Sequence, residues 1–192
     1  MSADSYKMPA QQQAVNVGRN QMKQFFLSIT LILTICLSAS SQDNNDWLIK
    51  KIKSADTVLL VSHEVTAGVT IVDDSTGKQL PLPKLTIANK PNYSIIKERQ
   101  IITDLQLDTL IEILARPFKD HKIEEGKCFM PHHAIFLISN GKTSYFDICF
   151  GCHRFDTSKD LSKIYAFDNR KWTELEDFFL KLGFKYELSE NE

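Results

Sequence analysis

The stretch HHAIFLISNGKTSYFDICF, residues 132–150, decides the fold of this 192-residue chain. Two apolar runs flank the dipeptide Asn140-Gly141, and this arrangement is the strongest short-range signal of a β-hairpin with a type I′ turn. A two-residue loop fixes the register of the two strands, so that Ser139 pairs with Lys142. The sequence therefore predicts an antiparallel hairpin in this stretch.

The same register predicts which side chains share a face of the hairpin. Successive side chains of a strand point to opposite faces of the sheet. The large apolar residues that fall on one face are Ile135, Leu137, Phe146 and Ile148. We expect this face to pack against helices.

Two segments outside the hairpin repeat apolar residues at helical spacing, 107–116 and 173–182. A capping box at 103–106 precedes the first and Pro117 ends it, whereas the second has a capping box at its own start and Gly183 at its end. A further helix at 46–53 and short strands at 57–62, 69–72 and 79–82 complete the prediction. We expect a single α+β domain, in which the two amphipathic helices pack on one face of an antiparallel sheet.

Residues 1–41 are expected to be a leader. One positive charge, Lys23, precedes the apolar run Phe25–Leu37, and small residues continue to Ser41, which is the layout of a secretory signal peptide. This run is too short to cross a bilayer, which needs about 20 apolar residues. We expect cleavage after Ser41 and an exported protein, periplasmic or secreted, with one globular domain over 42–192 and no transmembrane span.

Residues 1–21 are polar, which is unusual ahead of a signal peptide, so both Met1 and Met22 are candidates for the true start. Cys36 follows Ile35, which is bulkier than the small residue that precedes a lipid-attachment cysteine in bacterial lipoproteins, so no lipid anchor is expected there. The formal net charge is −1 and no basic stripe follows the leader. Nucleic-acid binding is therefore not expected.

Cysteine and histidine residues converge at the open end of the predicted hairpin. The register places His132 opposite Cys149 and brings Cys128 towards the end of the second strand, and directly opposite strand residues have Cβ atoms about 4.5–5.5 Å apart. The predicted cluster consists of Cys128, His132, His133, Cys149 and Cys152. Three cysteines follow the leader, so at least one is not in an intramolecular bridge.

Four interpretations of this cluster stay open. The first is a structural disulfide from Cys128 to Cys149 or Cys152, since bridges are the default for exported cysteines. The second is a zinc site, in which Cys128 and a histidine four or five residues later, His132 or His133, join the Cys149-x-x-Cys152 pair. The sequence identifies no cofactor, and it favours zinc over haem c.

The other two interpretations use the C-x-x-C pair chemically. Cys149-Phe150-Gly151-Cys152-His153 matches the C-x-x-C-H motif of covalent haem attachment, with His153 as axial ligand, although such motifs usually open a domain on a helix. A thiol-redox site is the last interpretation, but His153 to Asp156 do not resemble the helix start that lowers a thiol pKa in thioredoxin-like motifs.

One resemblance supports the choice of these residues. The pattern Cys128-x-x-Pro131-x-His133-Ala134-Ile135, followed by Ile148-Cys149-Phe150-x-Cys152, resembles a group of uncharacterised exported bacterial proteins of the Bacteroidetes type that share C-x-x-P-x-H-[AG]-I-x-F … I-C-F-x-C. The resemblance covers roughly residues 100–185. It implies Cys128, Pro131, His133, Cys149 and Cys152 as shared positions and no activity, and its lack of a residue like His153 disfavours haem.

The function expected from the sequence is that of an exported globular protein whose Cys/His cluster is mainly structural, held by a disulfide or by zinc. The alternative is a metal- or haem-dependent redox protein that uses the C-x-x-C-H motif. No nucleophile elbow, phosphate loop or HExxH motif occurs in the sequence, so no catalytic residue is assigned.

Overall fold

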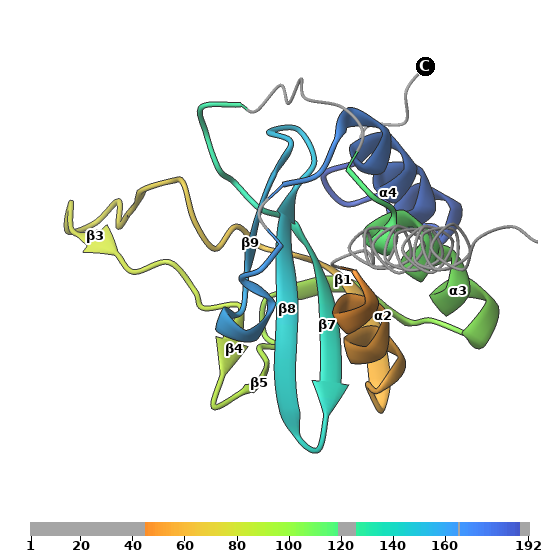
Figure 1. Cartoon of the computed structure of the whole chain (residues 1–192). Coiled ribbons are helices and arrows are strands. Elements are labelled where there is room, and N and C mark those ends of the chain that lie inside the picture. The colour runs from red at the N-terminus through yellow and green to blue at the C-terminus, as the bar shows by residue number, and fades with distance from the viewer. Residues whose placement is uncertain (1–44, 119–125, 165, 189–192) are drawn as a thin grey trace, which may run out of the picture. The chain divides into compact units, whose positions relative to one another are not determined.

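The computed structural model describes residues 45–118, 126–164 and 166–188, and these residues form one compact unit. An antiparallel five-stranded sheet, in the order β6-β1-β7-β8-β9, forms the centre of this α+β domain (Figure 1). Its strands are β6 (Ile96–Ile101), β1 (Thr57–His63), β7 (His133–Ser139), β8 (Lys142–Cys149) and β9 (Arg154–Thr157). The expected leader over 1–41, with Cys36, lies outside the described residues.

The predicted hairpin is confirmed as β7 and β8. Ser139 pairs with Lys142 and His133 with Ile148, which is the register that the two-residue turn imposes. Asn140 and Gly141 have φ values of 51° and 73°, as the two central residues of a type I′ turn require.

Among the described residues, three α-helices cover one face of the sheet, where two were expected (Figure 1). They are α2 (Asp46–Lys53), α3 (Asp104–Ala115) and α4 (Asn169–Lys181). The strand residues beneath them include all four of the predicted set, Ile135, Leu137, Phe146 and Ile148, each 0 or 1% exposed. This face of the sheet therefore forms the main core, with Leu110, Leu175 and Phe179 among the helix residues that fill it.

The helix ends are partly as predicted. The capping box of α3 is present, because Gln106 N–H donates to the Thr103 hydroxyl and Thr103 N–H donates to the Gln106 side chain. In contrast, α4 begins four residues before the predicted start, with Asp168 accepting from the backbone N–H of Lys171 at 2.8 Å. Thr173 lies inside the helix, where its hydroxyl donates to the carbonyl of Asn169.

The opposite face of the sheet carries a smaller core. Leu59, Val61, Ala134 and Phe136 of the sheet pack there against Leu85 and Ile95. The segment between β1 and β6 supplies these last two residues and also contains the short hairpins β2–β3 and β4–β5, in which β2 is Ile71–Val72, β3 Gln79–Leu80, β4 Thr86–Ile87 and β5 Lys90–Pro91. The strands expected at 69–72 and 79–82 are thus only two residues long each.

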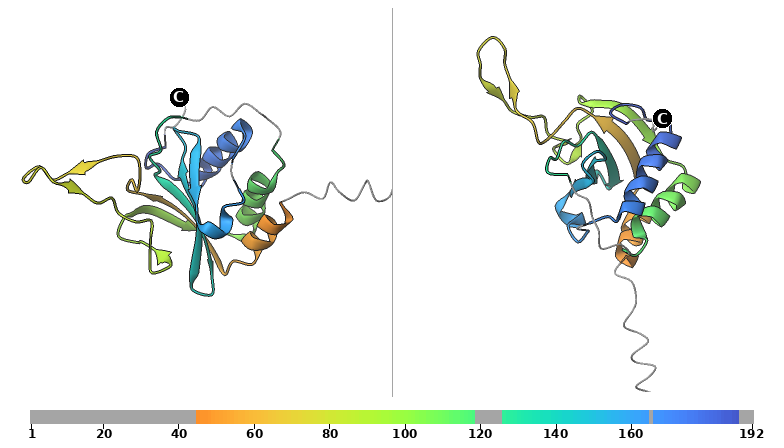
Figure 2. Two further views of the ribbon diagram at one scale, coloured as in Figure 1. Left: turned by 60° about the vertical axis from the view of Figure 1, so that its left-hand side comes forward. Right: turned by 90° about the horizontal axis from the view of Figure 1, so that it is seen from above.

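The hairpin β2–β3 forms an arm, residues 70–81, that projects away from the sheet (Figure 2). Its strands pair at only two positions, and Ile71, Val72 and Leu80 are exposed. The tip is closed by a turn in which the Asp73 carboxylate accepts hydrogen bonds from the backbone N–H and hydroxyl groups of Ser75 and Thr76. Local polar contacts, not a core, therefore hold the arm.

Candidate functional site: a thiol beside a disulfide

A disulfide joins Cys149, the last residue of β8, to Cys152 in the turn that leads to β9. The two Cα atoms are 5.3 Å apart, within the range that a bridge allows. The turn closes tightly, since His153 N–H donates to the carbonyl of Phe150 and Cys149 pairs with Arg154 across it. The prediction of a disulfide from Cys128 to Cys149 or Cys152 is therefore wrong. The β8–β9 turn brings Cys149 and Cys152 within bonding distance of each other, and they form the bridge.

Cys128 is the free cysteine of the described residues, and it lies directly against the bridge. Its sulfur is 3.4 Å from the sulfur of Cys152. The expectation that Cys128 would reach the end of the hairpin is thus confirmed, although as a thiol beside a disulfide and not as a partner in it.

The three cysteines differ in how far they are exposed to solvent. Cys149 and Cys152 are 5% and 3% exposed, whereas Cys128 is exposed. Thiol–disulfide exchange needs access of an attacking thiolate to a disulfide sulfur. A thiol in solution therefore meets Cys128 before it meets the bridge.

Two glycines hold the Cys128 segment against the turn. Gly126 N–H donates to the Cys152 carbonyl at 2.7 Å, and a Cβ on Gly126 would lie 3.1 Å from the Cys152 Cα. On the other side, a Cβ on Gly68 would lie 1.9 Å from the carbonyl oxygen of Phe129. Sequence reasoning missed both residues, because a close approach of two backbones leaves no signal in the sequence except the glycines themselves.

The guanidinium of Arg154 lies 5.7 Å from the centre of the Phe129 ring. A cation over an aromatic face is attractive, by about 0.5–1 kcal/mol at an exposed site. This contact joins the residue after Cys128 to the first residue of β9, so the segment is fixed to the turn by its side chains as well as by its backbone.

The predicted histidines do not join the sulfur atoms. His133 points to the helix face, where its ring lies 5.1 Å from that of Phe150 and 5.5 Å from that of Phe179. His132 places its Nδ1 3.3 Å from the His63 carbonyl and its ring edge-on to Tyr186. Within the ranges that the structure describes, no three His, Cys, Asp or Glu side chains are grouped to hold a metal ion, so the expected zinc site is not assembled.

The residues of the C-x-x-C-H motif do not fit haem attachment in this conformation. Both sulfurs that would form thioethers are joined to each other. The ring of His153 is stacked on Trp172, with centroids 5.5 Å apart and planes 12° apart, so it packs against α4.

A buried ion pair lies on the same face of the sheet as Cys149. The Nε2 of His63 is 3.1 Å from the Oδ1 of Asp147, and the Thr66 hydroxyl donates to the other carboxylate oxygen at 2.8 Å. His63 Nδ1 lies 2.7 Å from the Glu64 carbonyl, and since a carbonyl only accepts, this nitrogen carries a proton. His63 is therefore buried and partnered at both ring nitrogens.

The ion pair sets the protonation of His63. Burial lowers the pKa of His63, but the hydrogen bond and charge of Asp147, with smaller effects of the Glu64 and His133 backbone, outweigh it and raise the pKa above 6.5. The pair spans the middle strand β7, where Ala134 is opposite Asp147 on one side and the His132 carbonyl accepts from the His63 backbone N–H on the other. The imidazolium and carboxylate therefore connect β1 to β8 through the smaller core.

The burial of His133 has the opposite effect. Burial, followed by the positive charge of His63, lowers the pKa of His133 to about 3. His133 is therefore neutral near pH 7, and its ring packs against Phe150 and Phe179.

No protein-family model, curated protein or solved structure matches this chain in the comparisons with known proteins. Nor does any helix among the described residues have the length and apolar character needed to cross a membrane. The function is therefore argued from the site alone.

Proposed function

We propose that the protein is an exported thiol–disulfide exchange protein, in which Cys128 carries redox equivalents between the buried Cys149–Cys152 bridge and a dithiol partner outside. The observation that carries this proposal is the 3.4 Å separation between the Cys128 and Cys152 sulfurs. Export is an expectation from the sequence, and an oxidising compartment suits a site of this kind.

The first step moves the bridge within the protein. Cys128 loses its proton to water, and the thiolate attacks the Cys152 sulfur. The new bond joins Cys128 to Cys152, the Cys149–Cys152 bond breaks, and the Cys149 sulfur leaves with the electron pair and takes up a proton. No electrons enter or leave, so the bridge simply shifts from a buried pair to one that includes an exposed residue.

The second step exchanges electrons with a partner that has two thiols. A partner thiolate attacks the exposed Cys128 sulfur, forms a mixed disulfide and releases Cys152 as a thiolate. The second partner thiolate then attacks the partner sulfur of this mixed disulfide. The partner's own disulfide forms, and Cys128 is released as a thiolate. The partner leaves with a disulfide and the protein with three thiols, and a second, disulfide-bearing partner reverses these steps to restore the bridge.

Loop length argues against a mainly structural role for the bridge. Cys149 and Cys152 are three residues apart, and by the chain-entropy relation so short a loop yields about 2 kcal/mol. A Cys128–Cys152 bridge would close a loop of 24 residues of separation and yield about 3–4 kcal/mol by the same relation. The Cys149–Cys152 bridge thus stabilises the fold less than a Cys128–Cys152 bridge would. With the free Cys128 thiol beside it, this arrangement is better suited to thiol–disulfide exchange.

A matched pair of variants tests the internal step. Cys149→Ala leaves Cys128 and Cys152, whose sulfurs are in contact, whereas Cys152→Ala leaves Cys128 and Cys149. We expect Cys149→Ala to form an intramolecular bridge quantitatively under mild oxidation and Cys152→Ala to remain a dithiol, as read by thiol counting and mass spectrometry. Equal bridging in the two variants would contradict the proposed attack on Cys152.

A kinetic experiment tests the external step on the full-length protein. Glutathione is expected to reduce the Cys149–Cys152 bridge at least about tenfold more slowly in Cys128→Ser than in the parent, because the buried sulfurs lose their exposed relay. Acid-quenched parent should carry glutathione on Cys128. Equal reduction rates in Cys128→Ser and the parent, with no glutathione on Cys128, would overturn the proposal. The Cys149–Cys152 bridge would then be purely structural.

A further inference from the structure

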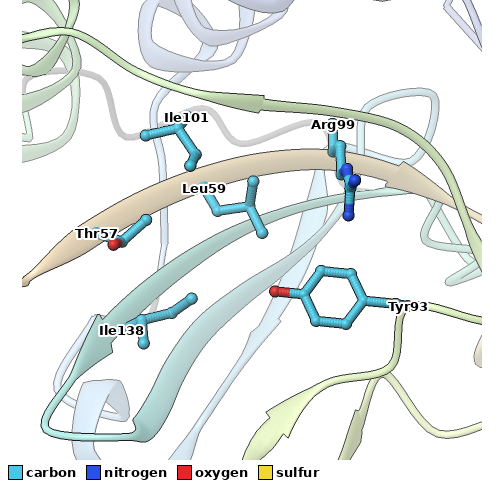
Figure 3. Close-up of a pocket in the computed structure, with 6 residues that line it drawn as sticks. All are labelled: Thr57, Leu59, Tyr93, Arg99, Ile101 and Ile138. Atoms are coloured by element: carbon cyan, nitrogen blue, oxygen red, sulfur yellow. The ribbon is translucent and has the colours of Figure 1, made fainter.

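A hollow of about 570 Å³ lies on the face of the sheet opposite the helices, away from the cysteines along the strands. Six residues line it, as Figure 3 shows: Thr57 and Leu59 of β1, Arg99 and Ile101 of β6, Ile138 of β7, and Tyr93 from the loop between β5 and β6. The smaller core fills the neighbouring part of this face with Leu85 and Ile95, but the hollow lies beyond them. Its volume is within the range of about 300–1,000 Å³ that is usual for small-molecule sites.

The floor of the hollow is aliphatic and open to solvent. Leu59, Ile101 and Ile138 lie on adjacent strands, since Leu59 pairs with Ile101 and Thr57 pairs with Ile138. Ile101 is 66% exposed and Tyr93 53% exposed. Leu59 itself is only 4% exposed, so the hollow has a buried aliphatic base with exposed apolar side chains at its edge. Exposed apolar surface rimmed by polar groups is one mark of a ligand-binding groove.

One cationic group stands at the wall of this apolar floor. The guanidinium of Arg99 lies 5.6 Å from the centre of the Tyr93 ring, and Figure 3 shows it extending towards that ring on the side of the hollow. Four of the five ion pairs of the described residues use Lys51, Lys97, Arg116 and Arg170, the fifth uses His63, and none uses Arg99. The Arg99 donors are thus available to an anion, and a planar guanidinium suits a carboxylate with two parallel hydrogen bonds.

We propose that this hollow binds a small amphiphile with an aliphatic body and a single carboxylate, the carboxylate on Arg99 and the aliphatic chain on Leu59, Ile101 and Ile138. The Tyr93 ring covers the junction between the two parts, and its hydroxyl extends over the floor as a second polar contact (Figure 3). This inference does not rest on the proposed thiol chemistry, because no residue of the hollow belongs to the sulfur site.

Decanoate is a suitable probe, titrated into the full-length protein below its micelle concentration and followed by calorimetry or by the tyrosine signal. Arg99→Gln should weaken decanoate binding by about ten- to hundredfold, the loss expected when a charge-assisted hydrogen bond is removed. Binding of decanol, which has the same chain without the charge, should not differ between Arg99→Gln and the parent.

Two further variants keep the test sharp. Lys78→Gln removes one positive charge at the tip of the arm and should bind decanoate like the parent. Ile101→Ser, at an exposed position, should weaken decanoate and decanol alike. Failure of the parent to bind decanoate, or equal binding by Arg99→Gln, overturns the inference, as does a stable dimer that dissociates on Ile101→Ser, which would assign the hollow to a second copy of the chain.

Discussion

Two histidines that point to opposite faces of the sheet give the protein opposing responses to pH. The pKa of His63 is raised above 6.5, so its contribution to stability is complete below pH 6.5 and is lost as the pH rises through the folded-state value. The pKa of His133 is lowered to about 3, so its contribution is complete above pH 6.5 and is lost as the pH falls towards 3. The summed contribution of these two histidines is therefore greatest near pH 6.5, the pKa of a free histidine.

His133→Asn is expected to flatten the acid side of this profile. Asn retains a donor near the position of Nδ1 but does not titrate, so the variant no longer takes up a proton on unfolding between pH 6.5 and about 3. The slope of unfolding free energy against pH should fall by at most about 1.4 kcal/mol per pH unit. Urea unfolding midpoints from pH 4 to 7 measure it, and parallel curves for parent and variant would show that His133 is protonated in the folded state.

Asp147→Asn is expected to act on the alkaline side. The variant leaves buried His63 without its carboxylate, so the pKa of His63 should fall and the loss of stability above pH 6.5 should disappear. Breaking a buried pair by removing one partner typically costs about 3–5 kcal/mol. Urea unfolding at pH 6 and pH 8 tests both effects, while Asp156→Asn, on the neighbouring strand β9, is a control for the lost charge. A variant as stable as the control at pH 6 would contradict this role for the pair.

At the scale of elements, the hairpin and its register were predictable because a two-residue turn determines them. The pairing of β7 with β8, from Ser139 opposite Lys142 to His133 opposite Ile148, follows from Asn140-Gly141 alone. The bonding partner of each cysteine was not predictable from the sequence. It depends on the turn after β8 and on the close backbone approach of Gly126 to Cys152. The strand β6 escaped prediction because an edge strand carries charged residues, here Lys97, Glu98 and Arg99, that hide its alternation.

The start of α4 shows the same limit. Thr173 and Glu176 have the spacing of a capping box, but Asp168 caps the helix and the Thr173 hydroxyl bonds back to the carbonyl four residues earlier. A threonine hydroxyl can accept from a backbone N–H as an N-cap, or donate to the carbonyl four residues earlier inside a helix. The sequence pattern therefore fits a threonine at the start of a helix and one within it. Which of them begins the helix depends on the burial of Phe167 and Trp172 in the main core.

Gly68→Ala is expected to disturb the element that presents Cys128. The new Cβ would lie 1.9 Å from the Phe129 carbonyl, so the segment after Cys128 must move. Gly77→Ala is the matched control, since Gly77 also has a positive φ, 65° against 81°, but meets nothing within 4 Å. Reduction by glutathione should slow in Gly68→Ala and stay at the parent rate in Gly77→Ala, although both variants carry about 1–2 kcal/mol of backbone strain. Equal rates in the two variants would show that the segment is not held by Gly68.

At the scale of the whole molecule, the two faces of the sheet have different roles. On one face, α2, α3 and α4 cover strand residues such as Phe146, and α4 contributes the large side chains of Trp172 and Phe179. The other face is covered only in part, and it carries the ion pair and the hollow. The sequence predicted the sealed face from its alternating apolar residues, whereas the partly covered face depends on a proline-containing segment with no periodic pattern.

Removing the bridge is expected to change global stability only modestly. Cys152→Ala should lower the unfolding free energy of the oxidised protein by about 2 kcal/mol, the entropy of a short loop, which corresponds to about 4–8 °C in melting temperature. Cys128→Ser should melt like the parent, because Cys128 is free. Calorimetry with and without reductant separates the cases, and a large loss in Cys128→Ser would reassign Cys128 to the bridge.

The arm β2–β3 has a practical consequence. Its tip is closed by contacts within residues 73–78, and a Cβ on Gly77 would meet open space. Exposed loop tips with small polar residues tolerate inserted sequence best. An epitope or a fluorescent domain grafted between Thr76 and Gly77 would therefore report on the protein in its native compartment without touching either core, the sulfur site or the hollow.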